Sequence, residues 1–268
     1  MKEIESNMNA WGKISEEHYH TFKERFKNGT HEFNEYILRE LGDLTGKKVI
    51  HLQCNTGADT LLLARTASQV TGVDLVPDNI VYAKKLAADL GCDNVRFIEH
   101  DVMTLAENHK EKYDVVFTSE GVLGWLPDLN IWAKTVRSLL NEDGYLYVFD
   151  SHPFYMTMDE SKLGQEIYDI KYPYFGKEPD VEETIGGYAA EVQDGVKAYF
   201  WMHTMSELIN GLADAGLHME YFNEYTENFY DSGNMQLSGK AGLYEYGYNR
   251  EKYPMSFSLK ASVYPGRL

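Results

Sequence analysis

The sequence predicts an α/β fold around a mostly parallel sheet, and three observations lead to this prediction. Short apolar runs alternate with stretches of helical periodicity between residues 46 and 153. Each run ends in a polar or glycine-containing loop, and helix-starting and helix-ending residues stand between the runs. Strands that alternate with helices in this way are joined by right-handed crossovers, so neighbouring strands are parallel.

The apolar runs predict five strands in this part of the chain, at residues 48–52, 70–74, 95–98, 113–118 and 145–150. The helix after the second strand is expected to begin at Pro77 and to end at Gly91, because these residue types favour those positions. Asp128 is expected to cap the helix that precedes the fifth strand. The residues 141–144 then read as a turn that leads into that strand.

The remaining segments depart from this alternation. Residues 1–45 carry apolar and aromatic side chains at helical spacing and predict one or two amphipathic helices. Residues 154–200 are rich in Tyr, Gly and Pro, and their place after a parallel strand suggests an inserted lid. A helix is expected at 206–215, followed by strands at 217–225 and 256–261. We therefore expect a helical cap at 1–45, a core at 46–153 and 201–268, and an insertion at 154–200.

Composition excludes several classes of function. The 268 residues include 25 Lys and Arg against 42 Asp and Glu, a formal net charge of −17, which argues against a protein that clamps nucleic acid. No apolar run approaches the length of a membrane span, and the first residues lack the apolar stretch of a signal peptide. Two cysteines and nine histidines show no metal-ligand spacing. We expect a cytoplasmic monomer or homodimer with a small neutral or cationic partner, and no nucleic-acid, membrane or metal partner.

Polar residues follow four of the predicted strands at the edge where parallel sheets bind ligands. The loop from Gln53 to Gly57 opens a helix, whose N-terminus favours anionic groups. Asp74 ends the second strand at the spacing that lets an acidic residue reach a ribose from such a loop. Asp101 ends the third strand, and Ser119 and Glu120 end the fourth. A pyrophosphate needs the glycines of G-x-G-x-x-G, and this loop has one glycine, so a nicotinamide-cofactor oxidoreductase is disfavoured.

The motifs VIHLQCNTG, VTGVD, EHDV, YDVVFTSEGVLGWLPD and DGYLYVFD resemble the ordered motifs of class I S-adenosylmethionine-dependent methyltransferases. The resemblance covers residues 45–152 and resumes at 204–225. It implies a Rossmann-like, seven-stranded, mostly parallel sheet with an antiparallel last strand, S-adenosylmethionine as cofactor, and S-adenosylhomocysteine as product. The cofactor-binding residues that it implies are Gln53, Cys54, Asn55 and Gly57 in the loop, Asp74 and Leu75 at the ribose, Asp101 and Val102 at the adenine, and Ser119 in the cleft.

The first loop departs from the family pattern, because His51, Gln53 and Asn55 stand where an acid and two glycines are expected. One reading of this departure is a non-catalytic module that binds S-adenosylmethionine or S-adenosylhomocysteine. The reading that we favour is an active variant in which His51 and Gln53 make side-chain hydrogen bonds. Asn can adopt the left-handed backbone that glycine provides, so Asn55 fits this reading.

The methyl acceptor is expected to be a small molecule, reached by in-line displacement. A hydroxyl or protonated amine also needs a proton acceptor, and a neutral imidazole is the usual choice near pH 7. His152 follows the fifth strand and is the candidate catalytic residue. Glu120, Tyr155 and His203 are the other candidates for the acceptor side. Each of these side chains also has an ordinary structural reading.

Overall fold

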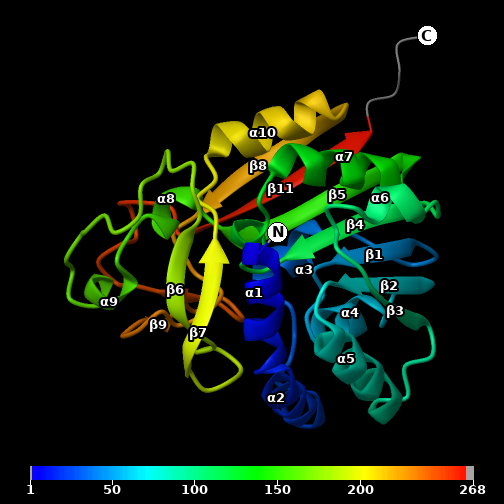
Figure 1. Ribbon diagram of the computed structural model, residues 1–268, viewed down its shortest axis with the longest axis horizontal. Helices are drawn as coiled ribbons and strands as arrows, with labels where there is room; N and C mark the ends of the chain where they lie inside the picture. The colour runs from blue at the N-terminus through cyan, green and yellow to red at the C-terminus, as the bar shows by residue number, and fades with distance from the viewer. Residues whose placement is uncertain (1, 264–268) are drawn as a thin grey trace.

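The computed structural model describes residues 2–263, and its centre is a seven-stranded sheet (Figure 1). In spatial order its strands are β3 (Val95–Glu99), β2 (Gln69–Asp74), β1 (Lys48–Leu52), β4 (Tyr113–Ser119), β5 (Leu140–Ser151), β11 (Ser256–Val263) and β8 (Leu217–Tyr225). β11 runs antiparallel to both of its neighbours, and the other six strands point the same way. The predicted Rossmann-like sheet with an antiparallel last strand is confirmed.

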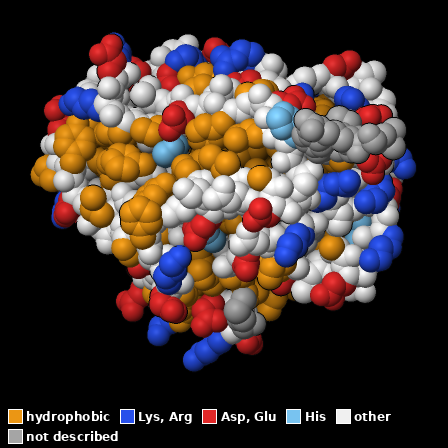
Figure 2. All heavy atoms as spheres, turned by 90° about the horizontal axis from the view of Figure 1, so that it is seen from above, with side chains coloured by type: hydrophobic (Ala, Val, Ile, Leu, Met, Phe, Trp, Pro, Cys, Tyr) orange, Lys and Arg blue, Asp and Glu red, His pale blue; other side chains and the backbone are white. Residues whose placement is uncertain are grey.

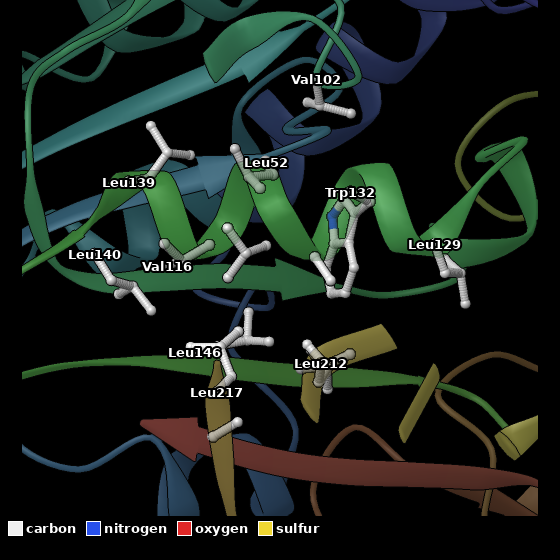
Figure 3. Close-up of a cluster of buried hydrophobic side chains, with 14 of the residues drawn as sticks. Leu52, Val102, Val116, Leu129, Trp132, Leu139, Leu140, Leu146, Leu212 and Leu217 are labelled. Carbon is white, nitrogen blue, oxygen red and sulfur yellow. The ribbon is translucent and has the colours of Figure 1, made fainter. Parts of the chain in front are cut away.

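Helices cover both faces of the sheet. One face carries α6 (Leu105–Asn108), α7 (Leu129–Leu139) and α10 (Met205–Asp214), and the other carries α3 (Glu35–Glu40), α4 (Ala58–Leu63) and α5 (Pro77–Asp89). Side chains along β4 alternate between the two cores, since Val116 faces α7 while Val115 and Phe117 face the other side. Figure 3 shows Trp132 of α7, which is completely buried, packed toward this sheet core.

Local signals set the ends of several helices. Asp128 Oδ1 accepts hydrogen bonds from the backbone N–H groups of Asn130 and Ile131 and so caps α7. Pro77 stands in the first turn of α5, and Gly91 follows its end with a φ of 65°, as predicted.

Two details of the predicted secondary structure are wrong, the number of helices before the sheet and the start of the fifth strand. Residues 2–45 form three helices, α1 (Lys2–Gly12), α2 (Ser15–Lys27) and α3, because the loop after α2 ends at Asn34, whose side chain caps α3. The predicted turn at 141–144 lies within β5. Leu140 already pairs with Tyr113 where α7 ends, and the extra residues are taken up by an irregularity in the pairing with β4.

The insertion contains α8 (Pro153–Met156), α9 (Glu160–Leu163) and a hairpin of β6 (Asp180–Ile185) and β7 (Gln193–Phe200). In Figure 1 the hairpin stands beside α1, and Asn7 exchanges hydrogen bonds of 2.6 and 2.7 Å with the backbone of Tyr199. The short η1 (Leu123–Trp125) follows β4, and β9 (Gln236–Leu237) pairs with β10 (Tyr244–Glu245). The division into cap, core and insertion stays a prediction, and its residues 1 and 264–268 lie outside the described part.

The insertion exposes several large hydrophobic side chains. Figure 2 shows hydrophobic side chains gathered on the side of the insertion. The exposed large hydrophobic residues of residues 154–200 are Phe154, Ile167, Tyr168, Ile170, Phe175, Val181, Tyr188 and Val192. Among the helices of residues 2–263, none is long and apolar enough to cross a bilayer.

Candidate functional site

A cavity of about 1180 Å³ lies at the carboxyl ends of the parallel strands. Its wall includes most of the predicted site residues: Gln53, Cys54, Asn55, Asp74, Leu75, Asp101, Val102, Ser119, Glu120 and His203. Gly57, His152 and Tyr155 are not part of the wall. The fold therefore brings ten of the thirteen predicted residues to one site.

The loop after β1 has the backbone shape that three glycines would give. Gln53, Asn55 and Gly57 have φ values of 57°, 49° and 78°, so all three are left-handed. Side chains usually disfavour this region, by about 1–2 kcal/mol for a residue such as Gln. Gly57 is required for a second reason, because a Cβ there would lie 2.7 Å from the Phe97 ring. The loop keeps its curvature although two glycines are missing.

Hydrogen bonds from the two non-glycine residues hold this loop. Gln53 Nε2 donates to the backbone oxygen of Val122 at 3.0 Å, which ties the loop to the segment after β4. Asn55 Oδ1 accepts from the backbone N–H of Thr56 at 2.6 Å. The side-chain hydrogen bond expected of Gln53 is present, and His51 Nδ1 lies 2.9 Å from Thr60 Oγ1. Burial lowers the pKa of His51 to about 4, so this imidazole is neutral at pH 7.

Asp74 is buried at the end of β2 and organises the surrounding backbone. Its Oδ2 accepts from the Asn55 N–H at 2.8 Å, and its Oδ1 accepts from the Val76 N–H at 2.9 Å and from Asn79 Nδ2 at 3.1 Å. Burial raises the pKa of this carboxyl, while these donors oppose the shift. Among the described residues Oδ2 accepts one hydrogen bond, so it retains the capacity to accept another donor from the cavity.

Asp101 and Val102 form the neighbouring wall after β3. Asp101 Oδ1 accepts from the backbone N–H of Met103 at 2.9 Å, and Val102 is 4% exposed. A buried apolar side chain next to a fixed carboxylate suits a flat, partly apolar ring that carries hydrogen-bond donors.

The end of β4 carries a polar cluster of which the sequence predicted Ser119 and Glu120 but not the other members. Ser119 Oγ donates to Asp59 Oδ2 at 3.4 Å, and His31 Nε2 lies 3.1 Å from Asp59 Oδ1. Asn34 Nδ2 donates to Glu120 Oε1 at 2.7 Å. Burial, followed by the charge of Asp59, raises the pKa of Glu120 well above its usual range. Asp59 follows the loop by two residues, but no spacing signal marks His31 or Asn34, which the loop before α3 brings to the site.

Asp150 fixes the segment that follows β4. Its carboxylate accepts hydrogen bonds from the backbone N–H groups of Gly121, Val122 and Leu123, and from its neighbour Ser151, at 2.7–3.1 Å. Burial nevertheless raises the pKa of this side chain to about 6. The backbone between Glu120 and η1 is thereby held against the cavity before any ligand is present.

The two histidines proposed for the acceptor side differ in position. His152 caps α8, where its Nδ1 accepts from the Phe154 N–H, and its Nε2 lies 3.0 Å from Glu224 Oε1. Both ring nitrogens thus contact protein groups. His152 does not face the cavity, although the sequence placed it at the acceptor side. His203 lines the cavity, and its Nε2 lies 2.7 Å from the Leu126 carbonyl oxygen, so Nε2–H donates there. Burial lowers the pKa of both rings, which favours their neutral forms.

Tyr155 of α8 is likewise outside the cavity wall, because its side chain is completely buried against Tyr246, Tyr253 and Met255. Its hydroxyl donates to Glu160 Oε1 at 2.7 Å and lies 3.3 Å from the hydroxyl of Tyr230. Glu160 and Tyr230 do line the cavity. Tyr155 therefore acts on the cavity through these two neighbours, and the sequence missed them because Tyr230 lies in the irregular segment before β9.

Acidic side chains outnumber basic ones in the cavity wall. The carboxylate residues in it are Glu32, Asp59, Asp74, Asp101, Glu120, Asp150, Asp159, Glu160, Glu182 and Asp231, and the lysine and arginine residues are Arg25 and Lys171. Lys171 is already paired with Glu182 at 2.9 Å. Within residues 2–263 no group of three or more potential ligand side chains is placed to hold a metal ion.

Comparisons with known proteins agree with this geometry. A family model described as a methyltransferase domain matches residues 43–186. A ubiquinone biosynthesis O-methyltransferase of Actinobacillus pleuropneumoniae is 31% identical over 116 residues, which are 42% of this chain and 49% of that protein. The corresponding enzyme of Photorhabdus laumondii is 28% identical over 127 residues, 47% of this chain and 49% of that protein. The chain thus spans about half the length of these curated relatives.

Solved structures share the fold over a greater length. The complex of DhpI with S-adenosylhomocysteine has a TM-score of 0.59 at 19% identity, and the match covers 98% of both chains. A methyltransferase from Methanosarcina mazei also has a TM-score of 0.59, at 18% identity, over 87% of this chain and 99% of that one. These likenesses extend the fold assignment to the insertion and the last strands. The chain belongs to the methyltransferase domain family, in its class I, S-adenosylmethionine-dependent branch.

Proposed function

We propose that this chain transfers the methyl group of S-adenosylmethionine to an uncharged or cationic small molecule. The observation that carries the proposal is the continuity of one cavity, whose wall runs from Asp74 and Asp101 to His203 and Tyr230. When bound, S-adenosylmethionine supplies an electrophilic methyl group on a sulfonium. The residues of the chain then have to hold donor and acceptor in line and exclude water.

The residues at the donor end fit such a cofactor. Two buried oxygen atoms of the loop, Gln53 Oε1 and Thr56 Oγ1, have no hydrogen-bond partner among the described residues. Buried polar atoms are normally paired, so these atoms support a polar ligand beside the loop. Asp74 would hold the ribose hydroxyls, Asp101 and Val102 would hold the adenine, and the segment from Gln53 to Gly57 would hold the methionine part.

The charge of the wall supports the acceptor class. Ten acidic residues line the cavity against Arg25 and Lys171, and no Lys or Arg of residues 2–263 pairs with Asp150 or Glu160. An acidic enclosed site repels phosphorylated or carboxylated acceptors and favours neutral or cationic ones. The curated relatives are named O-methyltransferases, so a small molecule with a hydroxyl group is the first acceptor to test.

For an acceptor that must lose a proton, we assign the proton to His203 rather than to His152. Donation from Nε2 to the Leu126 carbonyl sets the tautomer of His203 and leaves Nδ1 able to accept a proton. The cavity wall includes His203 and excludes His152. The catalytic role first predicted for His152 has no support from its position, which suits a positioning role at the start of α8.

The experiment compares thermal unfolding of the protein alone, with saturating S-adenosylhomocysteine and with NAD. A ligand at about 100 times its dissociation constant stabilises the folded state by about 2.7 kcal/mol, a shift of a few degrees at this size. Transfer of a labelled methyl group from S-adenosylmethionine to panels of phenols and aliphatic amines then tests the reaction. Stabilisation by NAD alone refutes the cofactor, and tight S-adenosylhomocysteine binding with no transfer to any panel member favours a binding module.

A further inference from the structure

The side chain of Asn55 makes contacts that a glycine at this position could not make. Its Oδ1 lies 3.2 Å from His18 Nδ1, and its Nδ2 lies 3.4 Å from the hydroxyl of Tyr188. His18 is completely buried in α2, whereas Tyr188 belongs to the loop that joins β6 and β7. Asn55 belongs to the loop Gln53–Gly57, here called the donor loop. Its side chain therefore contacts two distant segments, α2 and the hairpin tip at residues 186–192.

The hydrogen-bonding pattern at Asn55 is internally consistent. Oδ1 accepts from the Thr56 backbone N–H and has a second lone pair for a donor from the His18 ring. Burial lowers the pKa of His18, so its ring is neutral and we assign its proton to Nδ1. Asn55 Nδ2 then donates to the oxygen of Tyr188, whose ring meets that of His18 edge to face with 4.9 Å between centroids.

Other contacts join α2 to the hairpin tip and tie the two segments together. Arg25 Nη2 donates to the backbone oxygen of Tyr188 at 3.1 Å, and Glu17 Oε1 accepts from the Glu191 N–H at 2.8 Å. Ala189, which is 5% exposed, packs in the same hydrophobic cluster as Tyr19 of α2.

The hairpin tip is a tight turn whose backbone requires glycine. Gly186 and Gly187 have φ values of 113° and 104°, which other residues rarely adopt, and a Cβ at Gly186 would collide with the Glu191 carbonyl oxygen. Tyr188 next to them is 44% exposed, so its hydroxyl reaches Asn55 from the protein surface.

We infer that Asn55 is a positioning residue that fastens a cover, formed by His18 and Tyr188 with their segments, over the bound donor. This inference rests on the proposed donor site. Asn55 and Tyr188 both line the cavity beside the proposed methionine end, so their contact closes part of the wall there. The residue that replaces a family glycine thus slows exchange of the donor and of its product.

Asn55→Gly removes the contacts and keeps a residue suited to a φ of 49°. The two hydrogen bonds to His18 and Tyr188 are lost, besides the one from the Thr56 N–H within the loop. The dissociation rate of S-adenosylhomocysteine, measured by stopped-flow displacement, should therefore rise about fivefold to tenfold. Hydrogen exchange of residues 186–192 in the ligand-free protein should also become faster. Tyr188→Phe removes one hydroxyl and should raise the dissociation rate about twofold to fourfold.

Tyr168→Phe is the matched control, because it removes an exposed tyrosine hydroxyl of the same insertion that bonds Lys252 and not the donor loop. It should leave dissociation and exchange at the wild-type rates. Wild-type dissociation rates in both Asn55→Gly and Tyr188→Phe would overturn the cover while leaving the proposed function intact. If the wild-type protein fails to bind S-adenosylhomocysteine at all, both proposals fall together.

Discussion

Asp74 offers the sharpest test of how the donor site is built, because its carboxylate serves the loop and the proposed ligand at once. Replacement by Ala removes the acceptor of three hydrogen bonds, from the N–H groups of Asn55 and Val76 and from Asn79 Nδ2. A buried donor left without its partner costs about 1–3 kcal/mol. The Asn55 donor faces the cavity and can recover a bond to water, so we expect Asp74→Ala to lower the free energy of unfolding by about 3–5 kcal/mol.

Asp74→Asn separates stability from ligand binding. Its amide oxygen can still accept from Val76 and Asn79, so only the bond from Asn55 is lost and the free energy of unfolding should fall by about 1–2 kcal/mol. The charged hydrogen bonds proposed to the ribose are lost in both variants. Affinity for S-adenosylhomocysteine should therefore fall by about 1.5–3 kcal/mol, roughly 10- to 150-fold.

Urea unfolding followed by circular dichroism measures the first quantity, and calorimetric titration with S-adenosylhomocysteine measures the second. Asp143→Ala is the control, because Asp143 is an exposed carboxylate of β5 far from these contacts in the chain. Should Asp74→Ala unfold at the wild-type urea concentration, the hydrogen-bond account is refuted. Wild-type affinity in folded Asp74→Asn would refute the ribose assignment alone.

The remaining predictions concern the loop, the segment after β4 and proton transfer. Gly57→Ala should lower the free energy of unfolding by about 2–4 kcal/mol through a strained φ and a collision with Phe97, whereas Gly29→Ala, with similar φ and open space, should cost about 1 kcal/mol in the same urea assay. The pKa of Asp150 is raised from 3.8 to about 6, so its contribution to stability is complete below pH 4 and is lost as pH rises to 6. Relative to Asp150→Asn, the wild-type protein should lose about 2–2.5 kcal/mol between pH 4 and 7, and parallel pH profiles would contradict this. His203→Gln should lower turnover of a hydroxyl acceptor about 10²-fold or more without changing the donor KM, and an unchanged turnover removes His203 from the reaction.

The central sheet could be predicted because its signals are local. Each strand is a short apolar run, and Asp128 and Gly91 mark helix ends through their own backbone and side-chain preferences. The donor residues Asp74 and Asp101 follow from the same logic, since they stand directly after their strands. The backbone shape of the loop could be predicted only in part. Asn55 is a known substitute for glycine, whereas Gln53 adopts the left-handed backbone with a tertiary hydrogen bond to Val122 that no local signal marks.

The residues of the acceptor side were harder to predict from the sequence, because contacts between distant segments bring them to the site. His31 and Asn34 reach Asp59 and Glu120 from a loop without a motif. His152 follows a strand in the expected place, but the direction of its ring is set by α8 and Glu224, which no spacing encodes. Position along the chain predicted where the site is, and packing decided which side chains enter it.

The pairing of α1 with β7 has a consequence for how the molecule folds. Asn7 and Tyr199 are separated by 192 positions, and Ser6 bonds the backbone of Lys197 across 191. Contacts between residues so far apart require closure of a long loop, which is slow and costs chain entropy. The first helices therefore leave the ribosome well before their partner strand exists. We expect the part of the sheet formed by β1 to β5 to acquire protection early in refolding and α1 to be recruited last, so that the cavity is closed on the side of α1 only when the rest of the domain is complete.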